Sequence, residues 1–296
     1  MTVFSPAKLN FFLAVTGRRP DGYHELVSVA ALLDFGDELQ VEGSRIQNPE
    51  SSRFTLECDS ADVPVDGTNL VLKAAAAFAA ATGWRGGAAF RLTKRIPLGA
   101  GLGGGSSNAV AVLRALNQLT GGAAGEAQLA DIAATLGADC PLFLPDGPVV
   151  MRGRGERVEL LPAAAAARLR GRRVLLFKPD FPISTAWAYD RMAAEAPRQY
   201  VATDAAEARL TAWRQSNAPA EELLFNNMEG VAFAKFIALP VLLEKIRREF
   251  GVATQLSGSG SACFALLRDD FVAAPLAACI RECWGPGAFL REARLA

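Results

Sequence analysis

A glycine-rich run at residues 97–109, PLGAGLGGGSSNA, restricts the possible folds of this chain more than any other feature. Five of seven consecutive residues within it are glycine, so the backbone can adopt positive φ angles and approach a ligand closely. An amphipathic helix is predicted directly after the glycines, at 107–121, with Ser106 or Ser107 as the N-cap. Unpaired amide groups and the positive end of the helix dipole then face the same point. The run therefore predicts an anion-binding loop, and the alternative is a flexible linker between a strand and a helix.

Three familiar phosphate-binding patterns differ from this loop. A Walker A loop needs a lysine before its Ser or Thr, and no lysine stands here. Gly99, Gly101 and Gly104 match the dinucleotide fingerprint GxGxxG literally, but Glu126 lies in a Gly/Ala loop where an acid should end a strand. The partner motifs of a protein-kinase glycine loop are missing from the sequence. A dehydrogenase is the alternative that rests on the literal GxGxxG alone, and NAD binding would discriminate it.

Apolar periodicity along the rest of the chain predicts a mixture of strands and helices. Strands are expected at residues 9–15, 26–33, 37–43, 53–59, 88–97 and 172–180, and a strand, glycine turn and strand at 253–267. Helices are expected at 69–83, 126–140, 239–251 and 270–285, besides the one after the glycine loop. Gly83 and Gly137 are placed to end two of them. The pattern indicates an α+β fold with two domains, 1–159 and 160–296, because Pro162 and an alanine run mark a change of composition there.

Charge, hydropathy and cysteine content narrow the classes of function. Lys plus Arg and Asp plus Glu number 31 each, so no overall charge favours nucleic acid or an acidic membrane surface. No run reaches about 18 apolar residues, as a membrane span would, and Lys8 and Asn10 interrupt the apolar stretch that an export signal would need. The single histidine, His24, excludes a multi-histidine zinc site. The cysteines are scattered, as expected of reduced thiols in a cytoplasmic protein: Cys58, Cys140, Cys263, Cys279 and Cys283.

Two segments place polar groups in apolar surroundings and provide candidate catalytic residues. Lys8 and Asn10 stand in SPAKLN at the start of an apolar run, where a lysine usually extends its ammonium group to solvent. Asp139 follows a helix-ending glycine in LGADCPLF, where an aspartate often only caps the next turn. A carboxylate kept away from water is also a suitable general base. Both interpretations of each segment stay open on the sequence alone.

Two turns are candidate binding elements. In RRPDGYHE the Asp-Gly pair predicts a turn that presents Tyr23 and His24, an aromatic pair able to stack on a base and hydrogen-bond to it. In LSGSGSA, at 256–262, glycine and serine alternate between two apolar runs. A plain surface turn and a plain hairpin turn are the alternatives.

Taken together, three segments resemble the three motifs of the GHMP small-molecule kinases: PAKLN, PLGAGLGGGSSNA and SGSG. Within that superfamily, DGYHEL and LGADCPLF resemble the branch that phosphorylates the 2-hydroxyl of 4-diphosphocytidyl-2-C-methyl-D-erythritol in the non-mevalonate isoprenoid pathway. The resemblance spans residues 4–267. It implies an ATP-dependent α+β kinase with an N-terminal and a C-terminal GHMP kinase domain and the active site in the cleft between them.

The resemblance also implies catalytic and nucleotide-binding roles. Asp139 would take the proton of the 2-hydroxyl, and Lys8 would orient Asp139 and stabilise charge on the transferred phosphoryl group. Asn69 and Lys94 match family positions near the adenine of ATP. Mg²⁺ is expected with ATP, and no ligand is assigned to it. The ATP phosphates would be held by the loop residues Pro97, Leu98, Gly99, Ala100, Gly101, Leu102, Gly103, Gly104, Gly105, Ser106 and Ser107.

For the second substrate, the resemblance carries over Asn10, Tyr23, His24 and Thr185. Tyr23 and His24 would hold the cytosine, and Asn10 would contact the methylerythritol end. Trp187 and Tyr189 remain alternatives for a further aromatic contact near Thr185. The expected partner is thus a small molecule, with no nucleic acid and no membrane, bound by a monomer or a homodimer.

Two rival functions are less well supported by these residues. Another GHMP kinase, such as a homoserine or mevalonate kinase, has no nucleobase to recognise in its second substrate, and Tyr23 and His24 argue against it. A protein that binds nucleotides or sugars without turnover has no need of both Lys8 and Asp139. An ATP-consumption assay would decide between turnover and simple binding.

Overall fold

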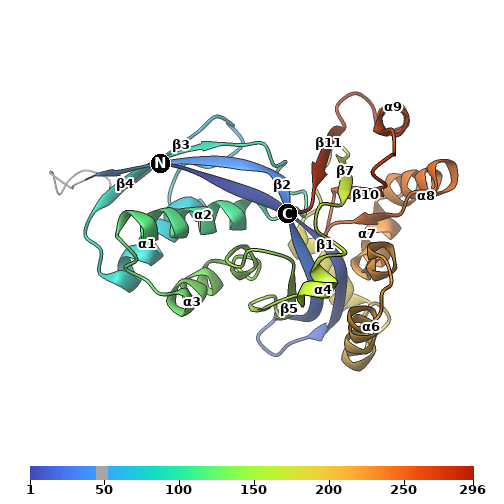
Figure 1. Ribbon diagram of the computed structural model, residues 1–296, viewed down its shortest axis with the longest axis horizontal. Coiled ribbons are helices and arrows are strands. Elements are labelled where there is room, and N and C mark those ends of the chain that lie inside the picture. The colour runs from blue at the N-terminus through green and yellow to red at the C-terminus, as the bar shows by residue number, and fades with distance from the viewer. Residues whose placement is uncertain (45–52) are drawn as a thin grey trace. The chain divides into compact units, whose positions relative to one another are not determined.

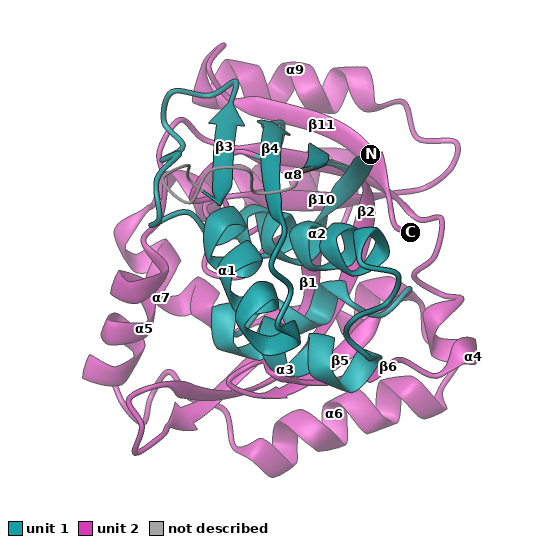
Figure 2. Ribbon diagram, turned by 90° about the vertical axis from the view of Figure 1, so that its left-hand side faces the viewer, with its two compact units in different colours: residues 1–7, 35–96, 103–146 teal, residues 8–34, 97–102, 147–296 magenta. Residues whose placement is uncertain are grey.

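The computed structural model describes residues 1–44 and 53–296, which form two compact units, teal and magenta in Figure 2. Two long strands, β1 (Thr2–Arg18) and β2 (His24–Ser44), run from one unit into the other, and the glycine loop is divided after residue 102. These units are defined by contacts within the chain and do not test the two family domains predicted at 1–159 and 160–296, which remain a prediction. Unit 1 comprises Met1–Ala7, Phe35–Ile96 and Gly103–Asp146, and unit 2 comprises Lys8–Asp34, Pro97–Leu102 and Gly147–Ala296.

Unit 1 is a sheet with helices packed on one of its faces. Its strands, besides the ends of β1 and β2, are β3 (Phe54–Cys58) and β4 (Gly87–Thr93). β3 pairs with β4 in parallel, and β4 pairs with β2 antiparallel. Along β4, Phe90 and Leu92 are buried while Arg91 is exposed, so only one face is covered. The covering helices, which also pack on one another (Figure 1), are α1 (Leu70–Thr82), α2 (Gly104–Leu119) and α3 (Glu126–Leu136), with the short η1 (Pro141–Phe143).

Unit 2 contains the remaining parts of β1 and β2 and a separate antiparallel sheet. β2 pairs with β5, β5 pairs with β6, and β1 pairs in parallel with β8. The second sheet has the order β11-β7-β10-β9. All five residues of β10 are buried, as in a strand that lies in the centre of a core. The strand bounds are β5 (Val149–Gly153), β6 (Arg157–Leu160), β7 (Arg173–Lys178), β8 (Phe225–Asn226), β9 (Thr254–Leu256), β10 (Cys263–Leu267) and β11 (Phe289–Arg294).

The helices of unit 2 are mostly amphipathic, with one apolar face turned to the core. In α8, for example, Leu239, Leu242, Leu243 and Ile246 are buried at helical spacing. The helices are α4 (Ala163–Ala166), α5 (Thr185–Ala194), α6 (Thr203–Gln215), α7 (Met228–Lys235), α8 (Ala238–Phe250) and α9 (Ala273–Trp284), with the short η2 (Ala220–Leu223).

The predicted α+β class is confirmed, but several elements differ from the sequence prediction. The strands β5, β6 and β8 correspond to no predicted strand. The strands expected at 26–33 and 37–43 are one continuous strand, β2, because Gly36 lets it pass β1 at very short range. A Cβ at Gly36 would lie 2.2 Å from the Ser5 carbonyl oxygen. The last strand, β11, was not predicted at all, since three of its six residues are charged and obscure any alternation.

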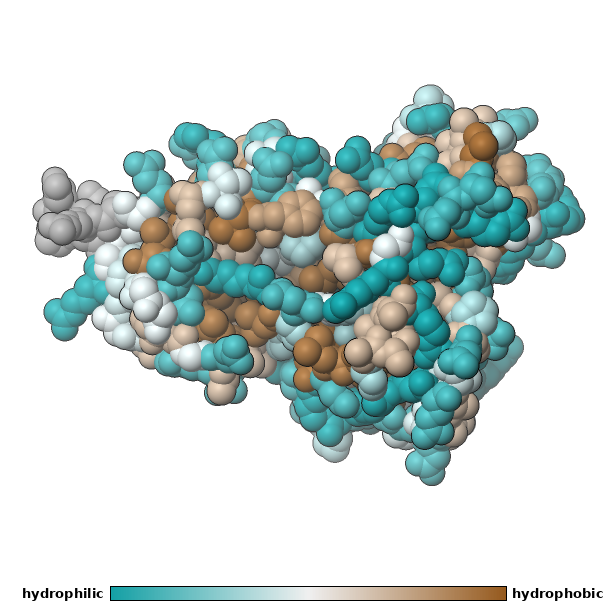
Figure 3. Space-filling model, in the orientation of Figure 1, coloured by the Kyte–Doolittle hydropathy of each residue, from teal (hydrophilic) through white to brown (hydrophobic). Residues whose placement is uncertain are grey.

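Large apolar side chains that reach the surface are spread along the chain. On the face shown in Figure 3, hydrophobic residues are interrupted by hydrophilic ones. Ile237 and Val272, at 72% and 70% exposed, are the most accessible of this kind in the described part of the chain. Scattered exposed apolar residues are normal in folded proteins. Within residues 1–44 and 53–296, the helices are too short or too polar to cross a membrane.

Candidate active site

Strand β1 holds two polar side chains inside the apolar core of unit 2. Lys8 and Asn10 are 3% and 4% exposed, and the Lys8 ammonium group donates a hydrogen bond to Asn10 Oδ1. Asn10 Nδ2 donates to Ser28 Oγ on β2 at 3.0 Å, and Ser28 Oγ donates to the Phe12 carbonyl at 2.6 Å. Burying an ammonium group is costly unless hydrogen bonds replace its water. Lys8 therefore does not extend into solvent, and its position is set by its neighbours.

The first half of the glycine loop contacts both other motifs within unit 2. The Lys8 amide donates to the Leu102 carbonyl at 3.0 Å. On the other side, Ser257 Oγ of the glycine-serine turn donates to the Gly101 carbonyl at 3.1 Å, although the two residues are 156 positions apart. The fold thus brings together the N-terminal motif, the glycine loop and the glycine-serine turn that the sequence singled out separately.

Two glycines make this close approach possible. A Cβ at Gly101, whose φ is +73°, would lie 2.1 Å from the Ser257 carbonyl oxygen. A Cβ at Gly258, whose φ is +58°, would lie 3.4 Å from both Lys8 Nζ and Asn10 Oδ1. The glycine-serine turn therefore lies directly against the Lys8 side chain. A plain hairpin turn would have no need of such small residues at these positions.

The second half of the glycine loop belongs to unit 1 and begins helix α2. The expectation that Ser106 or Ser107 is the N-cap is wrong: Gly103, at φ +74°, is the N-cap, and no side chain caps the helix. Both serines lie inside the first turn. Ser107 is 1% exposed and its hydroxyl accepts a hydrogen bond from Ser5 Oγ at 2.8 Å, whereas Ser106 is half-buried. A helix start without a side-chain cap leaves its amide groups available to an anion.

The segment that carries Asp139 lies beside this helix start in unit 1. Helix α3 ends before Gly137, as predicted, and a Cβ at Gly137 would lie 3.4 Å from Cys140 Sγ and 3.9 Å from Ser106 Oγ. Asp139 is half-buried. Burial raises the pKa of the Cys140 thiol to about 11, against a hydrogen bond with Ser106 that lowers it. Cys140 is therefore protonated and unreactive at neutral pH.

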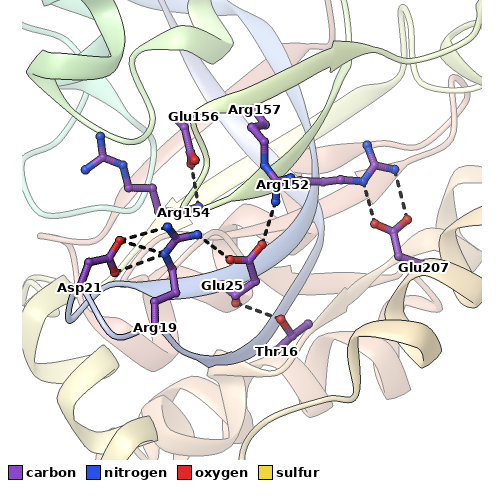
Figure 4. A network of polar contacts seen from close by, with 9 residues as sticks. All are labelled: Thr16, Arg19, Asp21, Glu25, Arg152, Arg154, Glu156, Arg157 and Glu207. Carbon is purple, nitrogen blue, oxygen red and sulfur yellow. Dashed lines mark hydrogen bonds and ion pairs between the residues drawn. The ribbon is translucent and has the colours of Figure 1, made fainter.

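Charged side chains hold the turn that precedes Tyr23 (Figure 4). Arg19 forms ion pairs with Asp21 at 3.0 Å and with Glu25 at 2.7 Å, and Asp21 Oδ1 accepts from the Tyr23 amide at 3.1 Å. Glu25 also pairs with Arg157 on β6, at 2.9 Å. Each exposed pair stabilises little by itself. As a network they tie the turn to the β5–β6 hairpin and give it one conformation.

Tyr23 and His24 lie in different environments. Tyr23 is 51% exposed, and the Arg154 guanidinium lies 4.9 Å from its ring centroid. His24 is only 8% exposed; its ring centroid is 4.7 Å from that of Tyr189, and its Nε2 is 3.0 Å from the Tyr200 hydroxyl. The two aromatic residues therefore offer one accessible ring and one imidazole with a fixed orientation, rather than two equivalent rings on an open turn.

The pKa of His24 lies below its ordinary value. Burial is the main cause and the nearby charge of Arg18 adds to it, while Asp190 acts in the opposite direction. His24 is therefore neutral at neutral pH and can both donate and accept a hydrogen bond.

The remaining expected substrate residues lie on α5 of unit 2. Thr185, its first residue, has its Oγ1 2.8 Å from Ser259 Oγ of the glycine-serine turn. Of the two aromatic residues left open by the sequence, Tyr189 packs on His24, whereas Trp187 contacts other side chains. The geometry therefore favours Tyr189 as the aromatic neighbour of the His24 imidazole.

The two residues expected near adenine lie in unit 1 and have partners within it. Asn69 is the N-cap of α1: its Oδ1 accepts from the Val71 amide at 2.9 Å, and its Nδ2 donates to the Pro64 carbonyl at 2.6 Å. The Lys94 side chain is 8% exposed and forms an ion pair with Asp37. Their contacts with a nucleotide stay predictions.

Sequence patterns miss three residues that the structure connects to the candidate ones. The Tyr200 hydroxyl lies 3.0 Å from His24 Nε2. Asn226 Nδ2 donates to the carbonyls of Leu256 and Gly258, at 2.9 and 2.8 Å, and so supports the glycine-serine turn. Asp37 binds Lys94. Nothing in the residues around them signals these roles, because every partner is distant in the sequence.

Comparison with known proteins identifies relatives along most of the chain. The model of the GHMP kinases N terminal domain matches residues 69–147, and that of the GHMP kinases C terminal domain matches residues 206–285. The 4-diphosphocytidyl-2-C-methyl-D-erythritol kinase of Synechococcus sp. (strain CC9902) is 38% identical over 281 residues, which cover 91% of this chain and 88% of the relative. The enzyme of the same name from Methylacidiphilum infernorum (isolate V4) is 36% identical, with 90% and 86% covered.

Solved structures share the fold. A crystal structure of 4-(cytidine 5'-diphospho)-2C-methyl-D-erythritol kinase superposes with a TM-score of 0.76 at 34% identity and covers 99% of both chains. Homoserine kinase from Cytophaga hutchinsonii also reaches a TM-score of 0.76, with 100% of this chain and 94% of that chain covered, but at 19% identity it shares the fold alone. With both family models matched and relatives above 30% identity along about nine-tenths of its length, this chain belongs to the 4-diphosphocytidyl-2-C-methyl-D-erythritol kinase family of the GHMP kinases.

Proposed function

We propose that this chain transfers the γ-phosphoryl group of ATP to the 2-hydroxyl of 4-diphosphocytidyl-2-C-methyl-D-erythritol, as a small-molecule kinase of the non-mevalonate isoprenoid precursor pathway. The observation that carries the proposal is the meeting, within unit 2, of Lys8, the first half of the glycine loop and the glycine-serine turn. Relatives that are named for this substrate extend over 91% of the chain.

The glycine loop suits the phosphates of ATP. A Cβ at Gly101 would lie 2.1 Å from a backbone oxygen, so a side chain is excluded there, and a Cβ at Gly104 would lie tightly, 3.1 Å, from Lys94 Nζ. Helix α2 begins without a side-chain cap. Backbone amide groups that lack a side-chain partner at a helix start are a good site for phosphate. The proposed contacts of residues 97–107 with ATP follow from this arrangement.

Mg²⁺ would accompany ATP, and the donor set fits a metal held mainly by phosphate. Among residues 1–44 and 53–296, no three His, Cys, Asp or Glu side chains are grouped as a metal site. Mg²⁺ keeps several waters and commonly takes only one or two protein ligands besides substrate phosphates. The half-buried Ser106 hydroxyl, in the first turn of α2, is the protein group we assign to it. Bound there, the metal would neutralise phosphate charge.

Lys8 and Asp139 are the proposed catalytic residues. In the transfer, the oxygen of the 2-hydroxyl forms a bond to the γ-phosphorus while the bond to the bridging oxygen of ADP breaks. Asp139 would accept the hydroxyl proton, because a carboxylate can serve as a general base and the neighbouring Cys140 thiol is protonated. The Lys8 ammonium group, held by Asn10, would stabilise charge on the transferred group.

The second substrate would be recognised mainly in unit 2. His24, braced by Tyr189 and Tyr200, offers directional hydrogen bonds to the edge of a cytosine, and Tyr23 offers an accessible ring for stacking. Asn10 would contact the methylerythritol end, and Thr185 the part of the substrate near the glycine-serine turn. Homoserine and mevalonate contain no nucleobase, so a kinase for either of them would not need such groups.

The proposed partner is this small molecule, with no nucleic acid and no membrane, and the proposed state is a monomer or a homodimer. A cytoplasmic location is part of the proposal. It is supported by the five cysteines, all of which are free thiols.

The proposal is tested by offering the purified protein ATP, Mg²⁺ and one of three acceptors: the cytidyl substrate, mevalonate or homoserine. We expect only the cytidyl compound to be phosphorylated. Mass spectrometry of the product and an assay of ADP release measure the reaction. Phosphorylation of mevalonate or homoserine instead would assign the chain to another branch of the superfamily. Binding of ATP with no turnover on any acceptor would support the non-catalytic alternative.

His24→Ala is expected to raise KM for the cytidyl substrate at least tenfold while KM for ATP stays within twofold of wild type. The substitution removes one buried hydrogen-bonding group, whose loss costs about 1–3 kcal/mol when its partner is left unpaired, and it also removes the ring that packs against Tyr189. Steady-state kinetics with each substrate varied in turn measures both constants. Discrimination against a uridyl analogue should weaken in parallel.

The pH dependence separates this role from a structural one. Because burial lowers the pKa of His24, KM for the cytidyl substrate should stay constant from pH 8 down to about 6.5, the ordinary histidine value, and rise only at lower pH. The stability that the neutral imidazole contributes is likewise lost as pH falls below that ordinary value.

Tyr200→Phe, which keeps the ring and removes only the hydroxyl partner of His24, should raise KM for the cytidyl substrate less than His24→Ala does. Equal impairment of both substrates by His24→Ala would make His24 a structural residue.

A further inference from the structure

A buried carboxylate in unit 1, Asp37 on β2, collects four hydrogen bonds. The side chain is 0% exposed. Its Oδ1 accepts from the amide groups of Arg95 at 2.7 Å and Ile96 at 2.8 Å. Its Oδ2 accepts from the Lys94 ammonium group and, at 2.9 Å, from Asn108 Nδ2. A carboxylate that accepts hydrogen bonds from this many directions is held in one orientation.

These donors lie at the two ends of the glycine loop. Ile96 is the residue that precedes Pro97, where the loop begins, and Asn108 follows the last loop residue, within α2. One carboxylate group thus joins the chain that enters the loop to the helix that leaves it. The distance between the two ends is set by Asp37, and the conformations available to the glycines between them are reduced accordingly.

Asp37 also places a positive charge at the start of α2. A Cβ at Gly104, the first residue of this helix, would lie 3.1 Å from Lys94 Nζ. A cation is unfavourable at the positive end of a helix dipole and unfavourable when buried, unless an anion accompanies it. Asp37 is that anion. An ammonium group held there adds to the attraction of the helix start for phosphate.

The network continues to β1 and is well satisfied. Asn108 Nδ2 also donates to Ser5 Oγ at 2.8 Å, and Ser5 Oγ donates to Ser107 Oγ at 2.8 Å. Asn108 Oδ1 lies 3.4 Å from Lys94 Nζ. A buried polar network whose members are paired specifies a single geometry. Strands β1 and β2 are therefore both connected to the first turns of α2.

We propose that Asp37 is a positioning residue for phosphoryl transfer. It holds both ends of the glycine loop at a fixed separation and keeps Lys94 beside the first residue of α2, so that the loop is organised for nucleotide phosphates before ATP arrives. Asp37 touches neither substrate in this role. The inference rests on the proposed binding of ATP by the glycine loop, and it adds the residue that organises the loop.

The test compares Asp37→Asn with Glu38→Gln. The two carboxylates are adjacent on β2 and pair with adjacent residues after β4, but the Glu38–Arg95 ion pair is exposed, with side chains 43% and 50% accessible. Asp37→Asn can keep the two hydrogen bonds from backbone amides. The side-chain NH2 group of the new asparagine, however, is a donor that faces the donors of Lys94 and Asn108, so those two hydrogen bonds are lost. We expect KM and the calorimetric Kd for ATP to rise at least tenfold in Asp37→Asn, with KM for the cytidyl substrate within twofold of wild type. Glu38→Gln should match wild type in all three.

Other outcomes overturn the inference. An ATP affinity of folded Asp37→Asn equal to that of Glu38→Gln would show that the loop needs no such support. A fall in kcat with both KM values unchanged would make Asp37 a residue of general stability. An equal rise in KM for ATP and in KM for the cytidyl substrate would do the same. If the wild-type protein neither binds ATP nor phosphorylates the cytidyl compound, the proposed function fails first, which is a different result.

A second pair of variants covers the case in which Asp37→Asn does not fold because Lys94 is left without its anion. Lys94→Met removes the buried cation, and the double variant Asp37→Asn/Lys94→Met leaves no unpaired buried charge. Against Lys94→Met alone, we expect the double variant to raise KM for ATP at least threefold further, because the connection from Asp37 to Asn108 is lost. Equal KM values in these two variants would refute the positioning of the loop.

Discussion

Asp139→Asn is expected to lower kcat by about 10²–10⁴-fold, the usual contribution of a general base, while the fold and the affinity for ATP are retained. Asp139 is half-buried, and an amide of the same shape can replace its carboxylate without leaving a cavity. The amide cannot accept the proton of the 2-hydroxyl. Single-turnover kinetics measures the loss, and calorimetry with ATP checks binding.

Asp146→Asn is the matched control for this experiment. It lies in the same unit, its side chain is 93% exposed, and its ion pair with Arg114 is at the surface. Its kcat should stay within twofold of wild type. Turnover of Asp139→Asn within a few-fold of wild type would remove the assignment as base and leave Asp139 as a capping residue of its turn.

Gly101→Ala is expected to weaken ATP binding at least tenfold and to lower the melting temperature as well. Its φ of +73° costs an L-residue about 1–2 kcal/mol, and the added Cβ would lie 2.1 Å from the Ser257 carbonyl oxygen. Because that contact is to backbone, the glycine loop and the glycine-serine turn must separate to admit a methyl group. Calorimetry with ATP and a thermal melt without nucleotide report the two effects separately.

Gly251→Ala isolates the cost of the backbone conformation. Gly251 ends α8 in the same unit at φ +65°, and nothing lies within 4 Å of its Cβ position. This variant should lose about 1 kcal/mol of stability and bind ATP as wild type does. If Gly101→Ala were no worse than Gly251→Ala in ATP affinity, the approach of the two loops would have no part in nucleotide binding.

Interactions that act over a few residues made much of the fold predictable. Helix α1 ends before Gly83, as predicted, and this glycine adopts the left-handed conformation at φ 70°. Its N-cap side chain, Asn69, was not predicted as a cap. Helix α8 was predictable from the helical spacing of its apolar residues, and strands β3 and β4 from the alternation of apolar and polar residues. In each case the pattern lies within the element itself. Where that signal is weak, as in the charged strand β11, the prediction failed.

The sequence could suggest which residues belong to the candidate site, but it could not predict the contacts between them. The glycine loop was recognisable as an anion site because its chemistry is contiguous. The first turn of α2 was misread, since serine is the usual N-cap and only packing shows that Gly103 takes this place while the Ser107 hydroxyl faces Ser5. The choice between Trp187 and Tyr189 also depended on tertiary structure, because His24 packs on Tyr189 alone of the two.

The sequence by itself predicted the α+β class, which is confirmed, many of the helix and strand positions, and the glycine loop, Lys8, Asp139 and His24 as candidate site residues. These follow from propensity, periodicity and short motifs, which are local properties of the chain. Tertiary structure alone decided that Asp37 joins the ends of the glycine loop and that Tyr200, 176 residues away, bonds to His24. Such pairs form because burial requires each polar group to find a partner, and only the packed chain determines which partner is within reach.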